Sequence, residues 1–169
     1  MVLGMSLATF TLVHVIISLI GIASGLIVMF GLLGSRPMPG LTAIFLLFTI
    51  LTSATGFLFP FTHLLPSHMI AILSLVLLAI ACIALYAMRL SGVWRPIYVV
   101  TAMISLYLNI FVLVIQSFLK VPSLQALAPA VPPNPPSGPV FAVVQGIVLV
   151  FFVLVIIGAW RRFRPVNFA

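Results

Sequence analysis

The 169-residue chain contains no aspartate and no glutamate. This absence excludes carboxylate general acids and bases, carboxylate proton relays, side-chain Mg²⁺ or Ca²⁺ sites, and salt bridges between side chains. A Ser-His-Asp triad would lack its acid. Histidine is the side chain left to titrate near neutral pH, and only three are present. We therefore expect a non-enzymatic protein whose polar chemistry depends on histidines and amides.

Cysteine and charge are also scarce. The single cysteine, Cys82, excludes an intramolecular disulfide, and its apolar neighbours favour a packing role. Charged residues make up 4% of the chain, against about 25% in soluble domains, and hydrophobic residues make up 64%. The mean hydropathy is +1.47. Such a chain suits a lipid bilayer, where a net charge of +7 favours anionic headgroups as its partners and not nucleic acid.

Long apolar runs dominate the remaining sequence. A helix needs about 20 residues to cross the hydrocarbon core, and helices are favoured there because they satisfy their own backbone polar groups. We predict an all-α integral membrane bundle that forms a single domain over residues 1–169. Its five transmembrane helices are expected at about 7–33, 41–59, 68–90, 97–118 and 140–160.

Three short connections and one long connection join these predicted helices. The short ones are rich in turn-forming residues, so consecutive helices are expected to be antiparallel neighbours. The long one, residues 119–139, contains seven prolines. Proline at this density predicts an extended, irregular or polyproline-like loop.

The basic residues predict the orientation of the bundle. With five spans, only Lys120 falls on one side of the membrane. The positive-inside rule therefore places the C-terminus in the cytoplasm and the N-terminus outside. The loop that carries His63 and leads to His68 then faces outward, as does the proline-rich loop. The opposite, cytoplasmic side receives six arginines: Arg36, Arg89, Arg95, Arg161, Arg162 and Arg164.

A few polar side chains interrupt the apolar spans. At 1.5 Å per residue, His14 lies roughly 10 Å below the outer surface. Asn109 lies near mid-membrane, where an unpaired amide costs roughly 2–7 kcal/mol, so a helix–helix hydrogen bond is its simpler interpretation. Taken together, these side chains concentrate in the outer half of the bundle. They predict an outward-opening ligand site formed by His14, His68, Asn109, Gln116 and Gln145.

The first span also carries a G-x-x-x-G motif at Gly21 and Gly25, on the same helical face as His14. Glycines at this spacing let two helices approach closely. The main interpretation is a packing seam within the bundle, which would turn His14 toward protein. The alternative is a homo-oligomer formed through these two glycines.

Several ligands are compatible with the predicted site. Its apolar flanks suit a small quinone- or lipid-like molecule, and the protein could equally serve as an accessory or assembly factor for a membrane-protein partner. The alternative is a redox protein in which His14 pairs with His68 or His63 to bind haem b. The same three histidines could bind copper or zinc, although no carboxylate is present to support such ligands.

Two stretches resemble a known group of proteins. They are TSATGFLFPF, at residues 52–61, and FVLVIQSFLKVPSLQALAP, at residues 111–129. Both are similar to a family of small, uncharacterised proteobacterial inner-membrane proteins. The resemblance implies the fold and a location in the bacterial inner membrane, and it implies no activity. His68 keeps the position of the family pattern, whereas Thr62 stands before His63 and the linker at 130–139 is uncharged.

Overall fold

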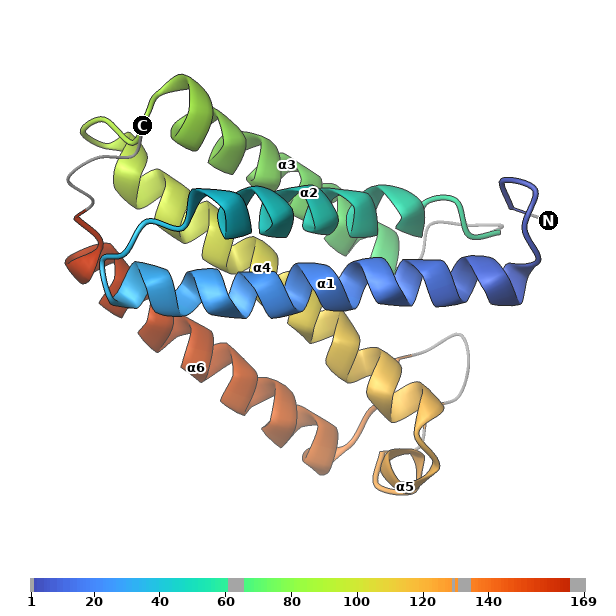
Figure 1. Cartoon of the computed structure of the whole chain (residues 1–169). Helices are drawn as coiled ribbons and strands as arrows, with labels where there is room; N and C mark the ends of the chain where they lie inside the picture. The colour runs from blue at the N-terminus through green and yellow to red at the C-terminus, as the bar shows by residue number, and fades with distance from the viewer. Residues whose placement is uncertain (1, 61–65, 129, 131–134, 165–169) are drawn as a thin grey trace.

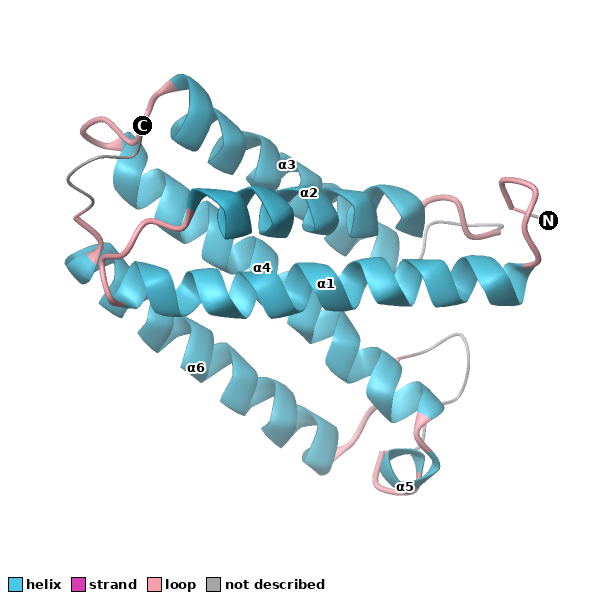
Figure 2. Cartoon of the chain, viewed as in Figure 1, coloured by secondary structure: helices cyan, strands magenta, loops and turns pink. Residues whose placement is uncertain are grey.

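The computed structural model describes residues 2–60, 66–128, 130 and 135–164. Within these ranges the chain is helical and contains no β-strand (Figures 1 and 2). The helices are α1 (Leu7–Leu33), α2 (Pro39–Gly56), α3 (Pro66–Cys82), a π-helical turn η1 (Ile83–Ala87), α4 (Trp94–Lys120), α5 (Pro122–Gln125) and α6 (Pro139–Arg162).

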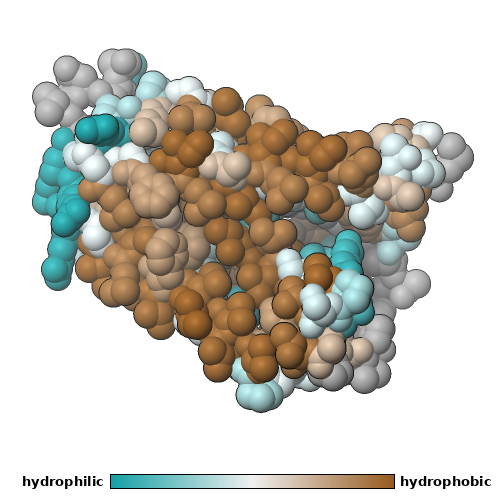
Figure 3. Space-filling view, turned by 60° about the horizontal axis from the view of Figure 1, so that its bottom comes forward, coloured by the Kyte–Doolittle hydropathy of each residue, from teal (hydrophilic) through white to brown (hydrophobic). Residues whose placement is uncertain are grey.

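Five helical segments are long and apolar enough to cross a membrane, with α3 and η1 acting together as one of them. Many large apolar side chains are exposed along them, and Figure 3 shows one face that is apolar over most of its length. Apolar surface exposed to this extent suits a membrane. The predicted all-α architecture is confirmed over the described residues, and its five long apolar helices fit a multi-pass membrane protein.

Local sequence signals explain where the helices begin. Ser6 precedes α1, and its hydroxyl accepts a hydrogen bond from the backbone N–H of Thr9 at 3.2 Å. Proline occupies the first turn of α2 and of α6, where its missing N–H costs nothing. Because Pro39 can start a helix, α2 begins two residues before the predicted position 41, and it ends at Gly56 instead of 59.

One other predicted boundary is corrected by the structure. The third span was expected to reach residue 90, but its helix ends at Ala87, and Arg89 and Leu90 take left-handed backbone angles. The loop at 119–139 was expected to be extended, irregular or polyproline-like. Within it, residues 122–125 form the single helical turn α5, because Pro122 suits the first position of a helix.

Helix α4 lies at the centre of the bundle and contacts α1, α2, α3 and α6 (Figure 1). Helices α1 and α6 approach each other where a Cβ on Gly158 would lie 3.0 Å from Leu33, and they separate toward their other ends. The apolar core gathers at the end where they approach. It includes Val28, Met29, Phe45, Leu78, Met103, Leu106, Phe152 and Phe163.

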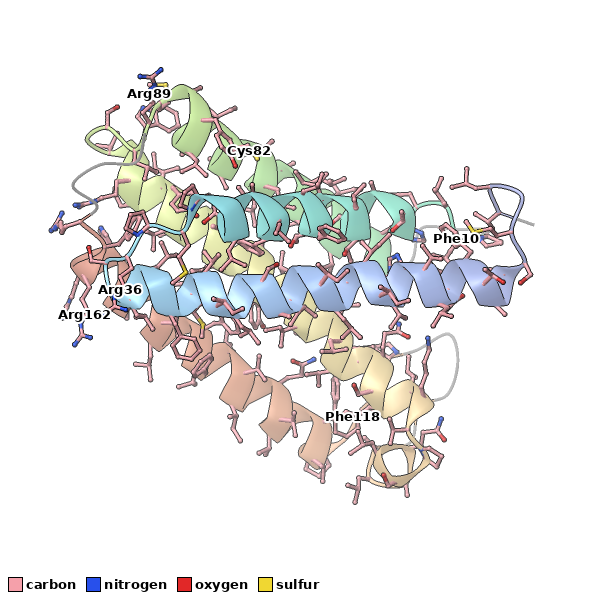
Figure 4. The ribbon with its side chains drawn as sticks, viewed as in Figure 1. Phe10, Arg36, Cys82, Arg89, Phe118 and Arg162 are labelled. Carbon is pink, nitrogen blue, oxygen red and sulfur yellow. The ribbon has the colours of Figure 1, made fainter. Side chains whose placement is uncertain are left out.

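The arginines lie at this same end of the bundle. Figure 4 shows Arg36, Arg89 and Arg162 there, and Figure 3 shows strongly hydrophilic surface along that end, with a smaller hydrophilic patch toward the opposite end. Arg95 is in the first turn of α4, and Arg164 follows the last turn of α6. Lys120 ends α4 at the opposite end. The bundle therefore has an arginine end with an apolar core, and a second end that carries the polar side chains of the predicted site.

The G-x-x-x-G face of α1 is a seam within the chain. A Cβ on Gly25 would lie 2.6 Å from Leu106 and 2.8 Å from the ring of Phe45. A Cβ on Gly21 would lie 3.2 Å from the hydroxyl of Thr49. Both glycines are buried against α2 or α4, so association of two copies through them would require those helices to move away.

Candidate functional site

His14 of α1 is held by a hydroxyl on α2. Its Nδ1 lies 2.7 Å from the Oγ1 of Thr55. The Thr55 hydroxyl also lies 2.7 Å from the carbonyl oxygen of Leu51 and 3.3 Å from that of Thr52. When its hydrogen goes to one of these carbonyls, the Thr55 oxygen accepts from Nδ1, which leaves Nε2 of the neutral ring as a hydrogen-bond acceptor.

Aromatic rings complete the surroundings of His14. The ring of Phe59 meets the imidazole edge-on, with centroids 5.1 Å apart. Phe59 also packs on the buried ring of Phe10 at 4.9 Å. His14 is half-buried and faces α2, as the helical spacing predicts. Its charge environment includes Lys120, which is close enough for an electrostatic interaction.

His68 contacts the residue that directly follows α2. It is in the first turn of α3, and only 4% of it is exposed. Its ring faces that of Phe57, with centroids 5.5 Å apart. Residues 55–59, at the end of α2, therefore contact both histidines. The two predicted residues are brought to one segment, with Phe57 against one of them and Phe59 against the other.

The third histidine, His63, lies outside the described residues. Within the described part of the chain, no three histidine, cysteine or acidic side chains come together as metal ligands. A three-histidine copper or zinc site and a haem ligated through His63 stay predictions.

Asn109 of α4 presents a buried donor. Only 9% of the residue is exposed, and its Nδ2 has no hydrogen-bond partner among the described residues. The helix–helix hydrogen bond expected for this amide nitrogen is therefore not formed. Asn109 shares a helical face with Tyr98, whose hydroxyl is directed toward Thr42 of α2 without the geometry of a hydrogen bond.

Gln116 continues this face toward the end of α4, because a separation of seven residues returns a helix to nearly the same side. Its side chain is half-buried. The same face carries Ser105 one turn before Asn109, and the Ser105 hydroxyl is satisfied by the carbonyl of Thr101 at 2.9 Å. The Asn109 amide and the Tyr98 hydroxyl are therefore two buried donors on this stripe without a hydrogen-bond partner among the described residues, and Asn109 is the one nearer Gln116.

Gln145 lies on a different side of α4. Its Nε2 donates to the carbonyl oxygen of Phe111 at 3.1 Å, which joins α6 to α4. Phe111 and Asn109 are two residues apart, or about 200° around a helix. Phe111 packs on Tyr107, and Tyr107 contacts Phe152 of α6. Helix α4 therefore stands between Gln145 and Asn109, and Gln145 acts as a helix–helix contact.

Sequence reasoning missed Thr55 and Phe59 as partners of His14. The signal that could have found them is the register of the α1–α2 hairpin. Gly25 meets Phe45, Gly21 meets Thr49, and His14 meets Thr55, so successive contacts step away from the connecting loop by nearly equal numbers of residues. Antiparallel neighbours joined by a short loop must pair in this way.

The chain matches no protein family model, no curated protein and no solved structure. The resemblance to small proteobacterial inner-membrane proteins therefore stays a prediction.

Proposed function

We propose that this protein is a non-enzymatic component of a bacterial inner membrane that binds a small apolar ligand of the quinone or lipid class. The ligand would bind beside α1, α2 and α4, at the end of the bundle away from the arginines. Binding of such a ligand would serve an accessory or assembly role for other membrane proteins. His14, His68, Asn109 and Gln116 are the candidate binding residues.

The buried amide of Asn109 carries this proposal. A buried donor without a partner costs about 1–3 kcal/mol, and hydrocarbon supplies no acceptor. A carbonyl oxygen of a ligand would remove that cost. Quinones and acylated lipids both present carbonyl oxygens on an otherwise apolar body, and a buried apolar site with few placed polar groups suits such molecules.

His14 supports the proposal with complementary chemistry. In the tautomer that donates from Nδ1 to Thr55, Nε2 of the neutral imidazole is an acceptor. An acceptor and a separate amide donor can together bind a molecule that carries both a hydroxyl and a carbonyl, such as a partly reduced quinone or an acylglycerol.

The arginines support an orientation for this site. All six lie at the end of the bundle opposite Lys120. Under the positive-inside rule, an end with this excess of arginine faces the cytoplasm. The His14 end would then open toward the outer leaflet, where the ligand would enter from lipid.

Ligand binding can be tested on the purified protein in detergent. Solvent extraction followed by mass spectrometry would identify a bound quinone or lipid, and thermal unfolding with a short-chain benzoquinone would measure binding. A ligand present at 100 times its Kd stabilises a protein by about 2.7 kcal/mol. We expect the wild-type midpoint to rise with quinone or with the extracted lipid. A wild-type protein that responds to neither would overturn the proposal.

The variant Asn109→Leu separates ligand binding from stability. Without ligand it should be at least as stable as the wild type, because the unpaired donor is gone. With ligand, its midpoint should no longer rise. The matched control is Gln145→Leu, which removes an amide on the α6 side of α4 and should keep the ligand response. An Asn109→Leu protein that still responds in full would place the ligand elsewhere.

A further inference from the structure

The arginine end contains a second arrangement, which does not depend on the proposed ligand site. Three segments that are distant in sequence meet there. The backbone N–H of Arg164, after α6, donates to the hydroxyl of Ser35 at 2.8 Å, between α1 and α2. The backbone N–H of Arg36 donates to the carbonyl of Gly31 at 2.8 Å. The backbones that carry Arg36 and Arg164 are therefore fixed beside each other.

Helix α4 supplies the third segment. Phe163 is fully buried, and its ring lies 6.3 Å from that of Tyr98 on α4. This packing holds the residue before Arg164 against the first turns of α4. Arg95 lies one turn before Tyr98, and its charge is close enough to that of Arg164 for the two to repel each other. Three segments that each carry an arginine thus meet at this end of the bundle, and we call Arg36, Arg95 and Arg164 the arginine cluster.

This cluster has no counter-charge on any side chain. The chain contains no aspartate or glutamate, so no acidic side chain can neutralise the cluster. Like charges held together by backbone hydrogen bonds and aromatic packing repel one another unless an anion from outside binds between them. Guanidinium groups suit phosphate because they donate two parallel hydrogen bonds in a planar fork.

We propose that Arg36, Arg95 and Arg164 form a binding site for the phosphate group of an anionic phospholipid. A lipid fits better than a soluble anion because exposed apolar side chains adjoin the cluster in sequence. Val93 is 68% exposed just before Arg95, and Trp160 is 52% exposed in the last turn of α6. Acyl chains would lie on this apolar surface while the headgroup meets the arginines. Basic sites at helix ends bind anionic headgroups in this manner.

The site can be tested with the full-length protein in lipid nanodiscs. Native mass spectrometry would compare retention of phosphatidylglycerol with retention of phosphatidylcholine. We expect the wild type to prefer the anionic lipid by roughly tenfold or more, since each basic residue near the surface adds several-fold to the attraction. The double variant Arg95→Gln/Arg164→Gln should lose most of this preference.

Matched controls distinguish a built site from general attraction. Arg89 lies at the same end but away from Arg36 (Figure 4), so Arg89→Gln/Arg161→Gln should retain most of the preference while removing two charges. An equal loss in both double variants would mean diffuse attraction and would overturn the proposal. Displacement of the lipid by millimolar inorganic phosphate would instead indicate a site for a soluble anion, which also overturns it.

A further double variant tests whether the planar shape of the guanidinium groups matters for binding. Arg95→Lys/Arg164→Lys keeps both charges but loses the planar fork. We expect its preference for phosphatidylglycerol to fall between those of the wild type and the glutamine variant. The helical content of each variant, measured by circular dichroism, must match the wild type. Full preference in the lysine variant would refute two-point recognition of the phosphate by the arginines.

Discussion

We predict that Nδ1 of His14 carries the proton of the neutral imidazole. The Thr55 hydroxyl can donate to the carbonyl of Leu51 and then accepts from Nδ1. The spacing of polar residues on α1 predicts that His14 faces protein, and this is confirmed. The identity of the partner depends on how α1 and α2 rotate against each other, which spacing along a single helix cannot give.

This contact leads to a prediction for Thr55→Val. The variant keeps the side-chain shape but cannot accept from Nδ1, so the preference for a proton on that nitrogen should disappear. Nitrogen-15 NMR of labelled histidine would report this change directly. The stability loss should be modest, about 0.6 kcal/mol, as is typical of polar contacts between membrane helices.

Thr52→Val is the matched control for this measurement. Thr52 donates to the carbonyl of Phe48 within α2 at 2.8 Å, and that bond does not involve His14. Its replacement should leave the His14 signals unchanged. A wild-type spectrum with the proton on Nε2, or a Thr55→Val spectrum identical to the wild type, would contradict the assignment.

Helix α1 packs as a seam against α2 and α4 because its glycines leave room for large side chains. The G-x-x-x-G spacing predicts that another helix approaches α1 closely at these glycines. In the structure the helices that approach are α2 and α4 of the same chain. The choice between this seam and a second copy could not be made from the motif alone, because both partners would exploit the same missing side chain.

Gly25→Ala is therefore expected to destabilise the bundle. Its Cβ would lie 2.6 Å from Leu106 and 2.8 Å from the ring of Phe45, so packed side chains would have to move. Overpacking of this kind costs about 1–3 kcal/mol. Reversible unfolding in mixed micelles would measure the loss.

Gly146→Ala provides the comparison on α6. A Cβ at that position meets nothing within 4 Å, so the substitution should be neutral or slightly stabilising through better helix propensity. Equal stability of the Gly25→Ala and Gly146→Ala proteins would show that the α1 seam tolerates a methyl group. The close packing described here would then be wrong.

In the molecule as a whole, the arginines lie at one end and the polar residues of the candidate site lie at the other. The apolar core and six arginines occupy one end, and His14, His68 and Gln116 occupy the other. The arginine segregation predicted from the sequence is confirmed as a spatial arrangement. Its assignment to the cytoplasmic side is a prediction that rests on the positive-inside rule.

Cysteine labelling in intact cells tests that orientation. In a Cys82→Ala background, Ser137→Cys lies before α6 at the end that bears Lys120, and Ser91→Cys lies in the loop at the arginine end. A membrane-impermeant maleimide should label Ser137→Cys in intact cells. It should label Ser91→Cys only after the membrane is permeabilised. The reverse pattern would invert the topology and turn the His14 end toward the cytoplasm.

Composition and spacing were sufficient to predict five apolar helices, their antiparallel order and the segregation of arginine. These properties follow from the length and polarity of each segment, because a bilayer selects apolar helices of spanning length whatever their neighbours are. The five apolar helices could therefore be predicted before any tertiary contact was known.

The composition of the candidate site depended on tertiary packing. Helix rotation and tilt are set by the shapes of neighbouring helices and not by hydrophobicity, because lipid and apolar side chains solvate a helix face about equally well. Spacing along the chain therefore predicted one site from four polar residues of the outer half and Asn109 at its floor, and that grouping stays a prediction. Packing joined Gln145 to Phe111 on the α6 side of α4, about 200° around the helix from Asn109. It also brought Arg164 to Ser35, which lies 129 residues earlier in the chain.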